Sequence, residues 1–472
     1  MANIKPATNR SPKIARSKAE HDWQRLCDSY LPVRRRGSIW RFSHKRRSNC
    51  PTRGWKLHVS ATVLSACDIF RLVGPYLRRR KVMFKGPKTL AELYKLNAGI
   101  FYGFSQVGKF ITIYPESTES AVALARELDR LIRNQPAPII PCDSQLRRGS
   151  CIFYRYGGFS NATVVFRRKR VPAITGPDGK RIPDRREPGA AIPKWLTDPF
   201  QRARSRTALE FATPLETDYT DYEAILQRGR GGNYYARDIS SARAKRVVIK
   251  EGRRHGETDP LGRDGVSRIK REEQVLRSVC LAAAPRLIRT FRANGCYHLV
   301  MERIVGRPLQ QVIASRERIS TRRLLGYCAE MARIVADIHA AGWAWRDCKP
   351  GNFLLEKSDK MRALDFEGAC RLHKADPPWL QTPGYAPPKR HKNNSDPMRE
   401  DLYALGTSMI QLIARSKSPT RCGAAFYREI KRRGLPRQLA KKIGHLRSLD
   451  VETRTSAGAI QHVVEELLRS ST

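Results

Sequence analysis

The sequence predicts an α+β protein made of two successive domains. Three observations lead to this prediction: short strand and helix patterns alternate over residues 54–166, a stretch rich in Pro, Gly and Asp follows, and a strand-rich region then precedes a long helical one. With 472 residues, of which 40% are hydrophobic, the chain can bury two cores. We divide it into a basic N-terminal extension (1–50), a first domain (51–200), a linker (201–220) and a second domain (221–472) with lobes at 221–305 and 306–472.

Side-chain periodicity defines the elements of the first domain. Trp55, Leu57 and Val59 alternate with polar residues, which predicts a strand with one buried face. Strands are also expected over 110–114 and 151–156, and a helix is expected over 118–133.

The second domain changes from strands to helices along the chain. Strands are expected over 246–250 and 297–301. A long helix is expected over 322–341, where Leu325, Met331 and Ile338 are among the apolar residues that recur at helical spacing. A small strand-rich lobe is therefore followed by a larger helical lobe.

The charge of the chain is unusual, because 90 Lys and Arg against 44 Asp and Glu give a formal net charge of +46. The basic residues are spread along the whole sequence without a helix-turn-helix or aromatic-interleaved motif, so nucleic-acid binding is disfavoured. We interpret most of this charge as solvated faces of an Arg-rich protein, and an acidic peptide or a phosphorylated substrate is the alternative that would suit the field. No apolar run reaches membrane-spanning length, and eleven scattered cysteines without a Cys-x-x-Cys pair predict reduced thiols and a cytoplasmic protein.

The second domain opens with residues suited to nucleotide binding. Glycines let backbone amides approach phosphate oxygens, and a lysine on a following strand can bind the same phosphates. Glu272, with Glu273 as the alternative, is expected on the next helix, where it would pair with that lysine. The candidate nucleotide-binding residues are Gly229, Gly231, Gly232, Lys250, Glu272 and, in a hinge between the lobes, Met301.

A second group of polar residues carries the chemistry of phosphoryl transfer. Asp347 would accept or orient a substrate hydroxyl, and Lys349 would neutralise the transferred phosphate. Asn352 and Asp365 would hold Mg²⁺ between the phosphates. Together with the segments 382–387 (TPGYAP) and 401–406 (DLYALG), these residues resemble the ordered motifs of eukaryotic-like Ser/Thr protein kinases. The resemblance implies a bilobal kinase fold that uses ATP and Mg²⁺.

Three positions depart from the kinase pattern. Trp345 replaces the usual His before Arg-Asp, Glu367 replaces the Gly of Asp-Phe-Gly, and Lys389 replaces the acid of Ala-Pro-Glu, leaving Arg454 without its customary partner. Every residue expected to touch metal or phosphate is present. An active enzyme is therefore favoured, and a pseudokinase scaffold is the alternative.

The first domain carries a second resemblance. The segments 54–61 (GWKLHVSA), 108–115 (GKFITIYP) and 155–159 (RYGGF) are similar to those of class III lanthipeptide synthetases, as are Gly176–Gly179 and Asp184–Arg186. In that family a phosphothreonine-lyase-like α+β domain precedes the kinase. The resemblance implies a bifunctional enzyme that phosphorylates Ser or Thr of a ribosomally made precursor peptide and then eliminates phosphate, leaving dehydroalanine or dehydrobutyrine.

The lyase chemistry requires a base, an acid and cations for the phosphate. Lys56 and His58 lie on one face of a strand, so both can address one phosphate. By resemblance to phosphothreonine lyases, His58 is the general acid and Lys85 the general base. Arg155 and Arg148 are expected to bind phosphate and to lower the pKa of Lys85. The family usually has an Arg before the Gly-Lys-Phe block, where residues 105–107 read Ser-Gln-Val, so a phosphate ligand is missing or replaced by Lys109.

Cysteine usage bears on ring closure. No cysteine is followed by His, so the zinc-dependent cyclase that often ends such synthetases is not expected, and a separate cyclase is a possible partner. The precursor peptide is expected to have an acidic leader. The alternative function is a regulatory Ser/Thr kinase whose first domain binds a phosphopeptide without acting on it.

Overall fold

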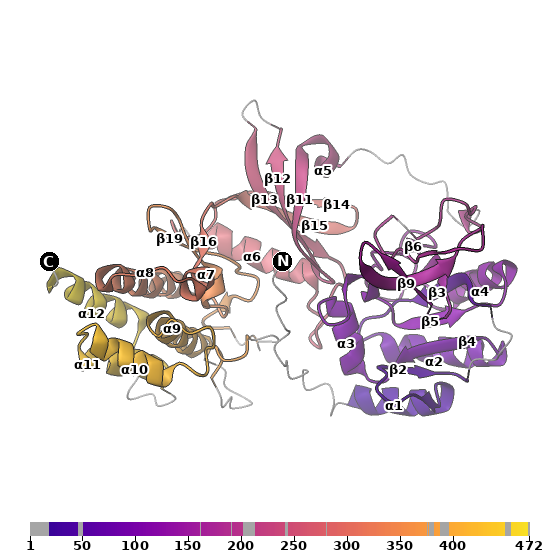
Figure 1. Cartoon of the computed structure of the whole chain (residues 1–472), viewed down its shortest axis with the longest axis horizontal. Coiled ribbons are helices and arrows are strands. Elements are labelled where there is room, and N and C mark those ends of the chain that lie inside the picture. Colours follow the sequence, from indigo (N-terminus) through magenta and orange to yellow (C-terminus); the bar gives the residue numbers. More distant parts are fainter. Residues whose placement is uncertain are drawn as a thin grey trace. The chain divides into compact units, whose positions relative to one another are not determined.

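The computed structural model describes residues 18–45, 51–160, 162–189, 191–201, 213–240, 244–279, 281–374, 376, 382–387, 396–448 and 455–470. The chain forms two compact units (Figure 1). One contains the chain up to residue 234 together with 250–267 and 291–298, and the other contains 235–249, 268–290 and 299–472. Lys389 and Arg454 lie outside the described residues. In the described part of the chain, no helix is long and apolar enough to cross a bilayer.

The first unit is built on a seven-stranded antiparallel sheet. Its strands, in spatial order, are β1 (Val33–Arg34), β2 (Trp40–Phe42), β4 (Met83–Pro87), β5 (Ile111–Tyr114), β3 (Arg53–Val59), β7 (Ile152–Gly158) and β6 (Ser144–Gln145). Four helices accompany the sheet: α1 (Lys18–Tyr30), α2 (Ala66–Arg79), α3 (Leu90–Ala98) and α4 (Thr118–Leu131), with the 3₁₀ helix η2 (Phe104–Gln106) between α3 and β5. The strands and the helix expected in this region are confirmed.

The register of this sheet gathers the predicted lyase residues. Thr112 of β5 is paired with His58 on one side and with Lys85 on the other. On the next strand pair, Lys56 lies opposite Arg155. Directly paired residues in an antiparallel sheet project to the same face. Side chains far apart in the sequence therefore meet on one face of the sheet.

Residues 18–45 belong to this domain, although their charge led us to expect an extension. Trp23 of α1 is fully buried, with its ring 5.1 Å from Phe70 and 5.2 Å from Phe110. Cys27 and Leu31 are buried one and two turns further on. The apolar positions recur every four residues, which is the spacing of one helix face. Surrounding basic residues obscured this pattern.

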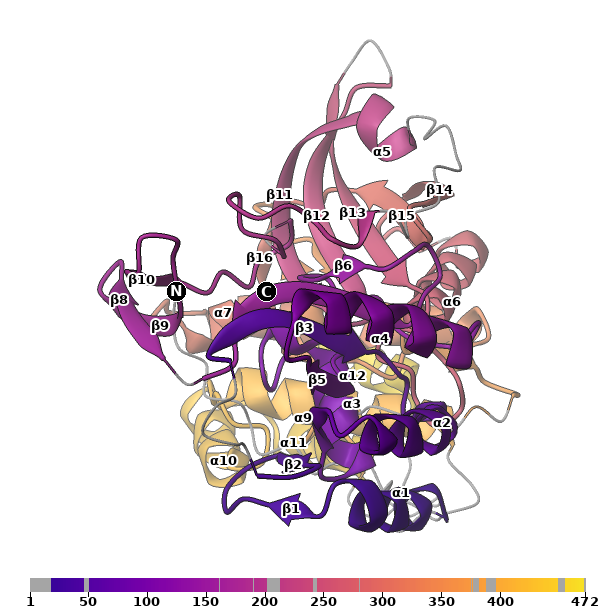
Figure 2. The same ribbon diagram turned by 90° about the vertical axis from the view of Figure 1, so that its right-hand side faces the viewer.

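A small antiparallel sheet lies within residues 163–183, in the region that is rich in Pro and Gly. Its order is β10 (Arg181–Pro183), β9 (Lys169–Thr175) and β8 (Thr163–Phe166) (Figure 2). Gly179, whose φ of 78° lies in the left-handed region, helps the chain turn between β9 and β10. This turn matters for the site because Asp184 follows β10 directly.

The five-stranded sheet of the kinase domain follows the short helix α5 (Pro214–Thr217). Its order is β11 (Tyr219–Arg228), β12 (Gly231–Asp238), β13 (Lys245–Arg253), β15 (Cys296–Glu302) and β14 (Leu287–Ala293), and helix α6 (Gly265–Ser278) lies between β13 and β14 in the chain. The division between the two units passes through this sheet. The strands expected over 246–250 and 297–301 are confirmed within β13 and β15.

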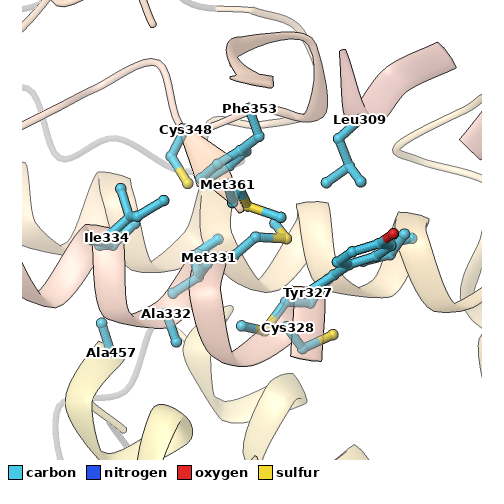
Figure 3. Close-up of a cluster of buried hydrophobic side chains, with 14 of the residues drawn as sticks. Leu309, Tyr327, Cys328, Met331, Ala332, Ile334, Cys348, Phe353, Met361 and Ala457 are labelled. Carbon is cyan, nitrogen blue, oxygen red and sulfur yellow. The ribbon is translucent and has the colours of Figure 1, made fainter. Parts of the chain in front are cut away.

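The rest of the second unit is mainly helical. Its helices are α7 (Leu309–Ala314), α8 (Thr321–Ala340), η4 (Pro350–Asn352), α9 (Pro397–Ile413), α10 (Gly423–Arg432), α11 (Arg437–Leu446) and α12 (Ala457–Ser470). Its short strands are β16 (Arg307–Pro308), β17 (Trp343–Ala344), β18 (Phe353–Leu355), β19 (Met361–Ala363) and β20 (Cys370–Arg371). Figure 3 shows the core, in which Met331 and Ile334 of α8 are buried beside Phe353 and Met361. The expected long helix is confirmed as α8, and its core supports the segment that carries Asp347.

Candidate active sites

The catalytic loop of the second unit is organised around Asp347. Its carboxylate accepts hydrogen bonds of 2.8 Å from Lys349 Nζ and 2.7 Å from Asn352 Nδ2. Thr382 also takes part, since its hydroxyl lies 3.1 Å from Lys349 Nζ and 3.2 Å from Asp347 Oδ1. Burial raises the pKa of Asp347, and the charge of Asp365 adds to this effect against the opposing influence of Lys349. The arrangement suits a carboxylate that orients a hydroxyl or takes up its proton.

Trp345 adopts a packing role at the position where a His was expected. Its side chain is fully buried and stacks on Phe366 with ring centroids 5.5 Å apart. Its indole Nε1 donates a 3.0 Å hydrogen bond to the carbonyl of Asp365. The backbone N–H of Phe366 in turn donates to Glu272 Oε1 at 3.2 Å. Trp345 and Glu272 therefore fix the segment that carries the candidate metal ligand Asp365.

A buried carboxylate of α9 holds the backbone of the catalytic loop. Asp401, which is fully buried, accepts 2.6 Å hydrogen bonds from the backbone N–H groups of Trp345 and Arg346. His339 Nε2 lies 3.0 Å from the same carboxylate. The loop is thus held by main-chain contacts that leave the side chain of Asp347 available for chemistry.

Arg346, the residue before Asp347, contacts one acidic side chain and one backbone carbonyl. Its Nε lies 3.3 Å from Glu400 Oε2, and its guanidinium also donates to the backbone carbonyl of Asp376. Arg271 of α6 forms an ion pair with the carboxylate of Asp376 at 2.7 Å and donates to the carbonyl of Ala369. These contacts connect α6, the segment after Asp365 and the catalytic loop within one unit.

The remaining kinase candidates lie on the five-stranded sheet or beside it. Gly229 lies between β11 and β12, where β12 begins with Gly231 and Gly232. Gly231 has a φ of 153°, and a Cβ there would lie 1.7 Å from the carbonyl oxygen of Glu251. Lys250 lies in β13, Met301 in β15 and Glu272 on α6. Glu272 is buried, whereas Glu273, the alternative, forms an ion pair with Arg277.

The first unit contains a largely buried cationic cluster, which we define as Lys56, His58, Lys85, Lys109, Asp143, Arg155, Asp184 and Arg186. Within it, the side chains of Lys85 and Arg186 remain partly exposed. Asp143 lies at its centre: Oδ2 is 2.5 Å from His58 Nδ1, and Oδ1 is 3.1 Å from Lys109 Nζ and 3.9 Å from Arg155 Nε. The side chain of Asp143 is completely buried. The alternating pattern of β3 predicts that Lys56 and His58 lie on its exposed face, but both are buried. Charged groups can be buried where they are paired with opposite charges, as they are here.

A second carboxylate organises the arginines of the cluster. Asp184 Oδ1 accepts a 2.6 Å hydrogen bond from Arg155, and Asp184 Oδ2 lies 3.2 Å from Arg186. Arg155 also donates to the backbone carbonyl of Arg185 at 2.7 Å. The segment after β10 is thereby fastened to the seven-stranded sheet, bringing Arg186 into the cluster.

Lys85 has the electrostatic environment that a lysine base requires. Its ammonium lies 4.2 Å from the centre of the Trp40 ring. Burial lowers its pKa to about 7, aided by the positive charges of Arg186, Lys109 and Arg35. Near neutral pH a substantial fraction is therefore unprotonated and able to accept a proton.

Lys56 and His58 are affected by burial in the same direction. Burial holds the pKa of Lys56 well below its usual value, and its ammonium lies 5.9 Å from the rings of Tyr114 and Phe159. Burial also lowers the pKa of His58 to about 3, against the opposing influence of Asp143. An incoming phosphate dianion would favour the protonated forms of both side chains.

The structure separates Arg148 from the other expected lyase residues. Arg148 is exposed on the turn between β6 and β7, so the geometry gives no support to its expected role as a phosphate ligand. Lys109 and Arg186 supply positive charge in the cluster instead. Lys109 was expected as a replacement ligand, and Arg186 lies in a segment that carried the family resemblance. The role of Asp143 had no signal in the sequence, because it lies in an irregular Pro-rich stretch without periodicity.

Comparison with known proteins assigns both halves of the chain to families. The RamC N-terminal domain matches residues 19–210, and the protein kinase domain matches residues 222–469. The probable SapB synthase of Streptomyces coelicolor is 32% identical over an alignment of 381 residues that covers 77% of this chain and 40% of that protein. Serine/threonine-protein kinase F of Synechocystis is 26% identical over an alignment of 215 residues that covers 41% of this chain and 43% of that protein.

The chain therefore corresponds to less than half the length of these relatives. Over that length the order of the two domain matches is the order expected from the sequence, and the kinase match alone covers more than half of the chain. The chain belongs to the protein kinase family and carries a RamC N-terminal domain ahead of its kinase domain.

Proposed function

We propose that this chain is a bifunctional peptide-modifying enzyme. It phosphorylates Ser or Thr of a ribosomally made precursor peptide with ATP and then eliminates phosphate to leave dehydroalanine or dehydrobutyrine. The observation that carries the proposal is the pairing, in one chain, of a kinase catalytic loop with a buried cationic cluster that contains a lysine of lowered pKa. The SapB synthase of Streptomyces coelicolor, a relative named as a synthase, supports it.

The first step would be phosphoryl transfer at the catalytic loop. Asp347 orients the substrate hydroxyl and takes up its proton, while Lys349 stabilises the transferred phosphoryl group. Asn352 and Asp365 would hold Mg²⁺, since amide and carboxylate oxygens are the ligands that this hard cation prefers. Bound Mg²⁺ would neutralise the charge that develops on the phosphates.

ATP binding would use the five-stranded sheet and α6. The backbone amides of Gly229, Gly231 and Gly232 would approach the phosphates, where Lys250 binds them. Glu272 would orient Lys250, and Met301, in the hinge, would contact the adenine ring of ATP. These assignments follow the kinase family match and the positions of the residues on the sheet.

The second step would be elimination at the cationic cluster. Neutral Lys85 removes the proton from Cα of the phosphorylated residue, and the electron pair of that C–H bond forms the Cα=Cβ double bond. The Cβ–O bond breaks, its electron pair stays with the phosphate oxygen, and His58 gives that oxygen a proton. Lys56, Arg155 and their cationic neighbours bind the phosphate and stabilise its charge.

The peptide substrate is expected to be acidic in its leader, because the field of a chain with a net charge of +46 would attract it. A separate cyclase is proposed as a partner for ring closure. The nine cysteines in the described residues are free thiols, which supports a reducing compartment such as the cytoplasm.

The test is mass spectrometry of a precursor peptide encoded beside the gene, incubated with the full chain, ATP and Mg²⁺. Phosphorylation adds about 80 Da, whereas net dehydration removes about 18 Da. We expect dehydrated peptide with the wild type, stalled phosphopeptide with His58→Ala and unmodified peptide with Asp347→Ala.

Other outcomes separate the alternatives. Phosphopeptide that the wild type never converts would identify a kinase with a non-catalytic phosphopeptide-binding domain. Failure to consume ATP with any peptide or protein substrate would identify a pseudokinase scaffold.

A further inference from the structure

Asp143 is a buried carboxylate for which the proposed reaction has no stated role. It lies in the irregular segment before β6, between Pro141 and Ser144, and its side chain has no exposed surface. An uncompensated carboxylate at such a depth would be strongly destabilising. Its contacts therefore need an explanation.

Both oxygens of Asp143 contact basic groups of the cluster. Oδ2 lies 2.5 Å from Nδ1 of His58, and Oδ1 lies 3.1 Å from Nζ of Lys109. His58 comes from β3, and Lys109 lies two residues before β5 begins. The carboxylate thus connects two neighbouring parts of the sheet through the side chains that would contact phosphate.

The charges around His58 give this contact a chemical consequence. Lys109, from the segment just before β5, and Lys56 of β3 face His58, and together with burial they disfavour its protonated form. Asp143 faces it from the segment before β6 and favours that form. The charges of His58, Lys109 and Arg155 overcome burial and hold the pKa of Asp143 below its usual value, so it remains ionised. A general acid must carry a proton before it can give one away, and Asp143 supplies the charge that supports this state.

We propose that Asp143 is a positioning residue for the elimination step. Its carboxylate holds Nδ1 of His58, so that Nε2 is the nitrogen that gives a proton to the leaving phosphate. The same carboxylate also holds Nζ of Lys109. During this transfer the Nε2–H bond breaks and the proton passes to the phosphate oxygen. The Nδ1–H group stays hydrogen-bonded to Asp143, which remains ionised, and His58 ends neutral. Carboxylates that orient an imidazole act in this way in other enzymes.

The inference rests on the proposed lyase function, and the experiment separates the two. The whole chain of 472 residues is given the precursor peptide in a synthetic phosphoserine form, and elimination is followed by mass spectrometry between pH 5 and 9. Asp143→Asn keeps the size of the side chain and removes its charge. We expect kcat for elimination to fall about 100-fold or more while KM stays within about threefold.

The pH profile distinguishes positioning from a packing role. Removing the negative charge lowers the pKa of His58 further, and a group with a lower pKa is protonated only at lower pH. The rate of Asp143→Asn should therefore begin to fall at a lower pH than that of the wild type. Asp143→Glu, which restores the charge, should recover part of kcat.

A matched control is available in the same domain. Asp129 is also buried and paired, with Arg147 Nε at 2.6 Å, but it lies outside the cluster. Asp129→Asn should leave the elimination rate within about threefold of that of the wild type, since no proton donor depends on Asp129.

An elimination rate in Asp143→Asn equal to that of the wild type would overturn the inference. Equal losses in Asp143→Asn and Asp143→Glu with an unchanged pH profile would do the same, and absence of elimination in the wild type would instead overturn the proposed function.

Discussion

The cationic cluster and the kinase catalytic loop handle phosphate in opposite ways. In the cluster, five basic side chains, Lys56, Lys85, Lys109, Arg155 and Arg186, accompany only two carboxylates. The catalytic loop instead places Lys349 with Asp347, whose side chains are 27% and 23% exposed, and Asp365 adds further negative charge. The first site carries its own counter-charge for phosphate, whereas the second depends on a cation that arrives with the nucleotide.

Because of this difference, the two sites should be sensitive to different changes in conditions and sequence. A buried set of like charges shifts pKa values strongly, so the cluster should respond to pH and to single changes of charge. A more open loop held by main-chain hydrogen bonds to Asp401 should respond to metal ions and to the contacts that hold its segment. Four predictions test this contrast, beginning with the largest effect.

Removal of divalent cations should separate the two activities completely. With excess EDTA, phosphorylation of the precursor peptide should cease, because the carboxylates of the catalytic loop cannot bring ATP phosphates close without Mg²⁺. Elimination from a pre-phosphorylated peptide should stay within about twofold, since the cluster supplies its own cations. Mass spectrometry of both reactions, with and without added Mg²⁺, measures this. Loss of elimination in EDTA that Mg²⁺ restores would contradict the comparison.

The elimination rate should depend on Lys85 and on pH. Because the pKa of Lys85 is lowered to about 7 and the base is its neutral form, the rate should rise with pH through about 7, until loss of the His58 proton lowers it at higher pH. Lys85→Arg, which stays protonated, should lower kcat about 100- to 1,000-fold at pH 7.5. Lys88→Arg is a suitable control, since Lys88 is exposed just beyond the end of the same strand. A rate independent of pH between 6 and 8 would argue against Lys85 as the base.

The two sites also differ in how far the sequence could predict them. The kinase residues Asp347, Lys349 and Asn352 lie within six positions, so their spacing is set by one local loop. The cluster draws His58, Lys85 and Arg155 from three strands, and only the sheet register brings them together. Family resemblance named these residues in advance, but periodicity alone would have placed Lys56 and His58 in solvent. Asp143 could not be predicted, because no local pattern indicates which cations a loop carboxylate will meet after folding.

Kinase activity should not require phosphorylation of the segment after Asp365. In many kinases a phosphate on this segment pairs with arginines and orders it. Here Asp376 pairs with Arg271, and Glu400 lies beside Arg346, so carboxylates already occupy such positions. Treatment of the purified chain with a protein phosphatase should therefore change the phosphorylation rate by less than about twofold.

Asp376→Asn should lower the same rate about tenfold, since it weakens the ion pair that holds Asp376 to Arg271 of α6. Asp337→Asn is the matched control, because Asp337 pairs with Arg333 on a partly exposed face of α8. A chain inactivated by phosphatase and reactivated by incubation with ATP would show that covalent phosphate is required after all.

Restoring the usual kinase residue at Trp345 should affect stability more than catalysis. The indole is fully buried, stacks on Phe366 and donates to the carbonyl of Asp365, so a smaller ring leaves a cavity beside the segment that carries this carboxylate. Trp345→His should lower the unfolding free energy of the kinase domain by about 2–3 kcal/mol, while its phosphorylation rate at 20 °C falls less than about fivefold. Thermal melting followed by calorimetry measures the first quantity, and Trp195→His, at a 42% exposed site, should leave it unchanged. Trp345 thus stabilises the loop rather than taking part in phosphoryl transfer, and a phosphorylation rate reduced 100-fold in a fully folded Trp345→His variant would contradict this assignment.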